Sequence, residues 1–178
     1  MNKTKTISEY GYSFQVKFIV CLMNDKLFLE QIVDILDGKY TSNDAFSWII
    51  KEIKDYYNQY KDVISMNVFK IKIQEIDSDL LIVNVKDVLK EVFKNIESSD
   101  LDYIKDKALD FHKSQVLKDA IVKSAEILER DGDSDEIKSL IDIAMQAGVE
   151  RNLGHDYYKI LMRGMKNLQE LHHQPRGI

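Results

Sequence analysis

The chain has 178 residues, of which 44% are hydrophobic and 31% charged, and these proportions are typical of a globular protein rather than a disordered one. Its formal net charge of −5 argues against direct DNA binding, because nucleic-acid binders usually present a basic patch. One proline and seven glycines are too few turn signals for an all-β fold, so the composition favours helices.

The first 98 residues are expected to form a small helical bundle. Apolar residues recur there at spacings of three and four, and Ser, Asn or Asp residues before each run can cap a helix. Ser13 is the expected cap of the first helix. The alternation of Ile71 and Ile73 would also suit a strand, although we favour a helix. The expected helical segments are 14–22, 27–36, 44–60, 68–76 and 80–96.

Residues 99–148 are expected to form a long antiparallel helical hairpin. No proline or glycine interrupts the helical pattern from Leu101 to Leu128, which corresponds to a rod roughly 45 Å long. The sequence 131–133 predicts a tight reversal, and Ser134 is the expected cap of the returning helix. Two helices cannot bury all their apolar surface on each other, so a stripe on the second helix is predicted to join subunits. This predicted oligomerisation stripe consists of Ile137, Leu140, Ile141, Ala144 and Met145.

Residues 149–178 are expected to be a linker that carries a C-terminal amphipathic helix starting at Asp156. Such a helix beyond a linker usually docks on a surface outside its own domain, although folding back onto the body is the alternative. The residues expected to dock are Tyr157, Ile160, Leu161, Met165 and Leu168.

No catalytic, cofactor-binding or metal-binding site is expected in this chain. It has no glycine-rich phosphate-binding loop, and its four histidines lack the spacing of metal ligands. Acidic clusters fall at turns and helix starts, where they suit the helix dipole. Trp48, Tyr56 and Tyr60 are a possible partner surface, although packing against the core is the commoner role of such aromatic residues.

The single cysteine and the longest apolar run indicate the cellular compartment in which the protein is expected. Cys21 can form no intrachain disulfide and is expected in the core. The run 18–23 is far shorter than the ~20 residues that span a bilayer. No secretion signal is evident near the N-terminus, so no membrane association and a cytoplasmic location are expected.

Three strings, in this order, resemble phage-type members of the DnaB replicative helicase family. They are Tyr10–Gln15 at the first helix, Phe111–Ile121 on the long helix and Leu153–Tyr157 in the linker. The tail Pro175–Ile178 resembles the step that precedes the ATPase domain in that family. The resemblance implies an N-terminal bundle and hairpin that form a collar, with a linker that leads to a RecA-like ATPase domain absent from this sequence.

By this resemblance, the chain is expected to be the collar and linker of a hexameric replicative helicase. It would form a homo-oligomer, either a dimer or a hexamer, and would bind a primase or a helicase loader. ATP, magnesium and DNA would be bound only by the absent motor domain, so the chain alone would be inactive. The alternative is a stand-alone helical adaptor or inhibitor of a replication protein. A third hypothesis is a small helical enzyme that uses His112 and Asp110.

Overall fold

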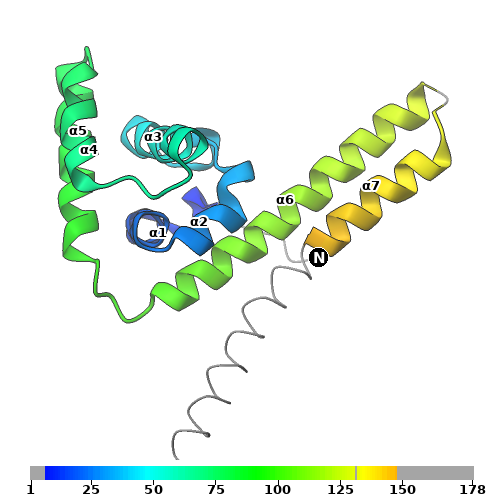
Figure 1. The fold of residues 1–178 in the computed structure, drawn as a ribbon, viewed down its shortest axis with the longest axis horizontal. Coiled ribbons are helices and arrows are strands. Elements are labelled where there is room, and N and C mark those ends of the chain that lie inside the picture. The colour runs from blue at the N-terminus through cyan, green and yellow to red at the C-terminus, as the bar shows by residue number, and fades with distance from the viewer. Residues whose placement is uncertain (1–6, 131, 148–178) are drawn as a thin grey trace, which may run out of the picture. The chain divides into compact units, whose positions relative to one another are not determined.

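The fold is known from a computed structural model that describes residues 7–130 and 132–147 (Figure 1). Within these ranges every regular element is an α-helix or a short 3₁₀ turn and no strand occurs, which confirms the all-α prediction. The predicted linker helix lies outside the described residues. The chain divides into two compact units, the first ending at Gln115 and the second starting at Val116.

The first unit contains five α-helices and the first half of a sixth. Side chains before four of these helices accept hydrogen bonds from backbone N–H groups of the first turn, as the composition of the loops predicts. The capping residues are Asp25, Asn43, Ser65 and Ser78. The helices are α1 (Tyr12–Asn24), α2 (Lys26–Ile32), α3 (Asp44–Tyr60), α4 (Met66–Lys72), α5 (Asp79–Lys94) and α6 (Leu101–Glu129).

The first helix begins earlier than the sequence predicts, and Ser13 is not its cap. Gly11 precedes α1 with φ +87°, a conformation that glycine adopts without steric cost. Its carbonyl accepts the first helical hydrogen bond, 3.3 Å from the Gln15 backbone N. Ser13 therefore lies inside the first turn, because the glycine rather than a polar side chain sets the entry to the helix.

Helix α1 supplies the centre of the first unit's core. Its side chains Phe18, Ile19 and Leu22 are essentially inaccessible to solvent. They pack in one cluster with apolar residues of the other helices, which is the arrangement expected of a bundle with one hydrophobic core. The largest fully buried side chains from the other elements are Leu29, Ile32, Phe46, Ile49, Ile50, Ile53, Ile64, Phe69 and Phe111.

The second unit contains a helical hairpin, in which the end of α6 and helix α7 (Ser134–Ala147) run antiparallel, side by side (Figure 1). The Gly132 N–H donates to the Ile127 carbonyl at 2.8 Å, which closes the turn. A β-carbon at Gly132 would lie 2.6 Å from Cγ2 of Ile127, so glycine is needed there. The cap is Asp133, which accepts from the Asp135 N–H at 3.0 Å, and not Ser134, because α7 already starts at Ser134.

Helix α6 contributes buried residues to each of the two units. In the first unit, residues 104, 108, 111 and 115 are buried at spacings of three and four. In the second unit, residues 120, 124 and 127 are buried at the same spacings. Within each unit, these spacings place the buried residues on one face of the helix.

Candidate interaction surfaces

One side of the hairpin is apolar. The residues of α6 and α7 that are buried within the hairpin include Ala120, Ser124, Ile127 and Ala144. The residue after each buried position lies about 100° further around its helix. Because both helices are right-handed and run antiparallel, these next residues point to the same side of the hairpin. Half-buried Ile137 and Leu140 are followed by Lys138 and Ile141, which point to the same side. What we call the hairpin face therefore consists of Ile121, Ala125, Leu128, Ile141 and Met145, with Lys138 as the one charged residue among them.

Apart from Lys138, the hairpin face is apolar, and it is open to solvent. Ile121 is 54% exposed, Leu128 64% and Met145 59%. The opposite flank, formed by the residues that precede the same buried positions, carries Asp119, Lys123, Glu126 and Ser139, with Ile143 as its one apolar member. An apolar surface contributed by two helices, with a polar surface behind it, is typical of a site that contacts another protein.

The predicted oligomerisation stripe divides between two roles. Ala144 is buried, and Ile137, Leu140 and Ile141 are half-buried, so most of this stripe packs within the hairpin. Met145 is exposed, and Ile141 lies at the edge of the same side. The α6 half of the face, which consists of Ile121, Ala125 and Leu128, was not predicted. Their spacing of four and three was visible in the sequence, but the buried side of α6 was not.

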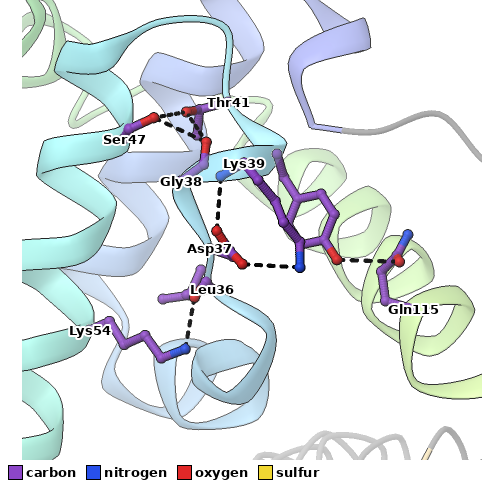
Figure 2. Close-up of polar contacts among 9 residues, drawn as sticks. Leu36, Asp37, Gly38, Lys39, Thr41, Ser47, Lys54 and Gln115 are labelled. Atoms are coloured by element: carbon purple, nitrogen blue, oxygen red, sulfur yellow. Dashed lines mark hydrogen bonds and ion pairs between the residues drawn. The ribbon is translucent and has the colours of Figure 1, made fainter. Parts of the chain in front are cut away.

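The turn Gly38–Tyr40 contacts the first half of α6 within the first unit (Figure 2). The Gly38 carbonyl accepts hydrogen bonds from the hydroxyls of Thr41 at 2.6 Å and Ser47 at 3.0 Å, which fix the turn against α3. Within this turn, Tyr40 packs edge-on against Phe111, and its hydroxyl donates to Oε1 of Gln115 at 3.4 Å. The turn thus holds the first half of α6 through one aromatic and one polar contact.

The side chain of Gln15 links the start of α1 to the loop before α3. Although it is only 1% exposed, both ends of its amide are satisfied. Its Nε2 donates to the Gly11 carbonyl at 3.2 Å, and its Oε1 accepts from the Ser42 N–H at 2.8 Å. Two of the strings that carry the helicase resemblance, 10–15 and 111–121, therefore contain residues that tie helices to loops.

The aromatic residues predicted as a partner surface are not equally available. Trp48 and Tyr56 are half-buried and pack against the core. Only Tyr60 is largely exposed, and its ring lies 4.6 Å from that of Tyr56. The set therefore offers one accessible ring rather than a continuous aromatic surface.

The histidine considered for chemistry is a packed residue of α6. His112 is 3% exposed and comes directly after the buried Phe111, whereas Asp110 is exposed and pairs with Lys107 at 3.7 Å. Among the described residues, no group of three or more His, Cys, Asp or Glu side chains is arranged to hold a metal ion. In the same part of the chain, no helix is long and apolar enough to cross a membrane.

A second surface, which was not predicted from the sequence, lies between α4 and α5 in the first unit. It is a groove of about 770 Å³. Four of the ten residues that line it are lysines and none is acidic. The lining residues are Met66, Phe69, Lys70, Ile73, Gln74, Lys86, Leu89, Lys90, Phe93 and Lys94.

Comparison of the chain with models of protein families, with curated proteins and with solved structures finds no match.

Proposed function

We propose that this chain is an assembly domain whose hairpin face pairs it with another copy of itself, in the role of an N-terminal collar of a DnaB-like replicative helicase. The observation that carries the proposal is the hairpin face, where exposed apolar side chains from α6 and α7 lie on one side. The helicase role rests on the three strings that resemble that family and on the order of bundle, hairpin and linker.

The hairpin face suits a symmetric contact between two copies. In a twofold interface the same patch serves both subunits, so an apolar patch meets an apolar patch. A specific interface buries about 800 Å² on each partner, and the exposed side chains Ile121, Leu128 and Met145 would form its apolar centre. Burial of each such side chain is worth roughly 1.5–3 kcal/mol before the costs of association.

In the proposed collar, pairs of hairpins would join six subunits into a ring. The helical body would receive a primase or a helicase loader, and the linker after residue 148 would lead to the ATPase domain. ATP, magnesium and DNA would bind to that domain. The chain itself would contribute assembly and partner binding to DNA replication in the cytoplasm.

The second candidate is a stand-alone helical adaptor or inhibitor that binds a replication protein. It is supported by the same apolar face, which would then cover a different protein instead of a second copy. The two proposals make different predictions for the gene beyond codon 178. Sequencing past this codon should reveal a G-x-x-x-x-G-K-[ST] motif for the collar, and a stop codon in its place would favour the adaptor.

Cross-linking tests the pairing of copies directly. In a Cys21→Ala background, a single cysteine is introduced at Ile121, Leu128 or Met145, and the protein is treated with a short bismaleimide. We expect covalent dimers from these variants because the face lies at the contact between copies. Ile143→Cys is the matched control, since Ile143 is 61% exposed but lies on the polar flank. Equal cross-linking of the control, or none by the three face variants, would refute the pairing.

A further inference from the structure

The groove between α4 and α5 has an apolar floor. Phe69 is fully buried beneath it, Leu89 and Ile73 are 6% and 7% exposed, and the ring of Phe93 stands at its edge with 66% of its surface exposed. The exposed ring of Phe93 would gain free energy from covering by apolar side chains.

The rim of the groove is basic, although the chain as a whole is acidic. Lys70 lies on α4, and Lys86, Lys90 and Lys94 succeed one another at intervals of four residues along α5. Side chains four residues apart lie on one face of a helix, one turn after another. The three α5 lysines therefore form a row of positive charge about 12 Å long, with one lysine on each turn of the helix.

The lysines of the rim are open to an anionic partner. Lys90 pairs with Asp87 at 2.9 Å, and Lys94 pairs with Glu91 at 2.7 Å. Both are solvent-exposed ion pairs between residues three positions apart on α5. Such exposed pairs contribute little to stability and exchange readily. Among the described residues, no ion pair holds Lys70 or Lys86.

We infer that this groove binds an acidic amphipathic helix of another protein. The apolar side chains of the incoming helix would pack over the floor of the groove and cover the exposed ring of Phe93, and a row of carboxylates beside them would match the lysine row of α5. Recognition of an amphipathic helix in a groove commonly combines apolar anchors at i, i+4 and i+7 with flanking charges. A single carboxylate, such as that of a fatty acid, would match only one of the four lysines.

The charge of the chain's own terminal segments argues against them as the occupant. Residues 1–6 contain two lysines and no acidic residue. Residues 148–178 contain five Lys or Arg residues and three Asp or Glu residues. Both segments are therefore basic and would be repelled by the lysine row. Because the groove belongs to the first unit, its binding of a helix is independent of the proposed pairing of hairpins.

Binding of a designed peptide to the full chain tests the inference. The probe is a fluorescein-labelled peptide of about sixteen residues, long enough to approach helicity, with leucine and phenylalanine at i, i+4 and i+7 and glutamate beside them. The comparison peptide carries lysine in place of every glutamate. We expect saturable binding of the acidic peptide by fluorescence anisotropy, at one peptide per chain. Binding should weaken as NaCl rises from about 50 to 500 mM.

Matched variants locate the binding. Lys70→Glu combined with Lys86→Glu should weaken binding by about tenfold or more, because it reverses charge on both walls of the groove. Lys51→Glu combined with Lys123→Glu makes the same change in net charge at exposed positions outside the groove and should bind as the wild type does. Phe93→Ala should also weaken binding, and circular dichroism checks that each variant is folded.

Three outcomes would overturn the inference. The first is equal binding of the acidic and lysine peptides, or equal binding by the two double variants. The second is saturable binding of a fluorescent fatty acid, lost in Lys70→Glu/Lys86→Glu, with no binding of the acidic peptide, which would assign the groove to a small amphiphile. The third is a molar mass that halves in Lys70→Glu/Lys86→Glu but not in the control, which would assign the groove to a second copy.

Discussion

The ammonium of Lys105, in the first turns of α6, lies 2.8 Å from Oδ2 of Asp25, the residue that caps α2. Burial disfavours the charged form of Asp25, but hydrogen bonds from Lys105 and from the Phe28 N–H outweigh it and hold the pKa of this carboxyl below its ordinary value of 3.8. One carboxylate therefore serves both as a helix cap and as the partner of a lysine on α6.

Substitution of Asp25 separates its two roles. Asp25→Asn keeps a capping side chain but loses the ion pair, which should cost about 0.2–1 kcal/mol for a partly exposed pair. Asp25→Ala loses both contacts and should cost about 1 kcal/mol more, because an alanine cannot cap α2. The free energy of unfolding in urea measures both variants. Equal stability of the two variants would mean that the cap contributes nothing.

Acid should weaken the first unit, in part through Asp25. Since the folded pKa of Asp25 is below its value in the unfolded chain, its charged form stabilises the fold above about pH 4, and this stability is lost as pH falls through the folded pKa. Asp37 and Asp100 also have lowered pKa values and act in the same direction. Urea unfolding between about pH 6 and 3 should show a shallower loss of stability for Asp25→Asn than for the wild type. Identical slopes would contradict the assignment.

Truncation of two phenylalanines to alanine should change the stability of the fold by very different amounts. Phe111→Ala should cost about 3–5 kcal/mol, because its ring is 1% exposed and packs against Tyr40. Phe93→Ala should change stability by less than about 0.5 kcal/mol, because most of its ring is in solvent. Thermal unfolding measures both. A large loss of stability in Phe93→Ala would show that the groove edge is part of the core.

The turn shown in Figure 2 should not tolerate a side chain at Gly38. A β-carbon there would lie 2.8 Å from Cβ of Ser47, so Gly38→Ala must push the turn away from α3. We expect a loss of about 1–3 kcal/mol, the usual cost of overpacking. The neighbouring side chain of Lys39 is exposed, so Lys39→Ala is the control, with almost unchanged stability. If Gly38→Ala were as stable as Lys39→Ala, the close approach of Gly38 to Ser47 would be refuted.

The thiol of Cys21 should be unreactive in the folded protein. Burial raises its pKa to about 12, although nearby Lys105 acts in the opposite direction, and only 1% of the residue is exposed. Because the thiolate is the reactive form, labelling with Ellman's reagent at pH 8 should proceed only as fast as the fold opens. Complete labelling within the mixing time in the absence of denaturant would contradict this.

The helices and the hairpin were predictable because their signals are local. Apolar spacings of three and four marked α3 and α7, and Asn43 and Ser78 lie at the caps where polar residues were expected. The entry to α1 was predicted wrongly because Gly11, which acts through its backbone, leaves no polar capping signal. The confirmed all-α fold thus followed from periodicity. The two caps were misplaced by one or two residues, because Gly11 acts through its backbone at α1 and Asp133 rather than Ser134 caps α7.

The surfaces were less predictable because they depend on packing between helices. Ile121 and Leu128 belong to the hairpin face only because α7 covers the neighbouring side of α6, and no pattern within α6 shows this. The groove combines residues 66–74 with residues 86–94, and its lysine row on α5 looks in sequence like an ordinary solvated face. Both surfaces required the arrangement of helices in space.

Molar mass by light scattering over a concentration series tests the central claim, that the hairpin face pairs copies of the chain. The wild type should rise above the 20.8 kDa of one chain as concentration increases. Ile121→Asp combined with Met145→Asp should remain at the mass of one chain, because it places charges on the face. Val122→Asp combined with Ile143→Asp changes equally exposed residues off the face and should behave as the wild type does. A wild type of 20.8 kDa at every concentration, or equal masses for the two double variants, would contradict the claim.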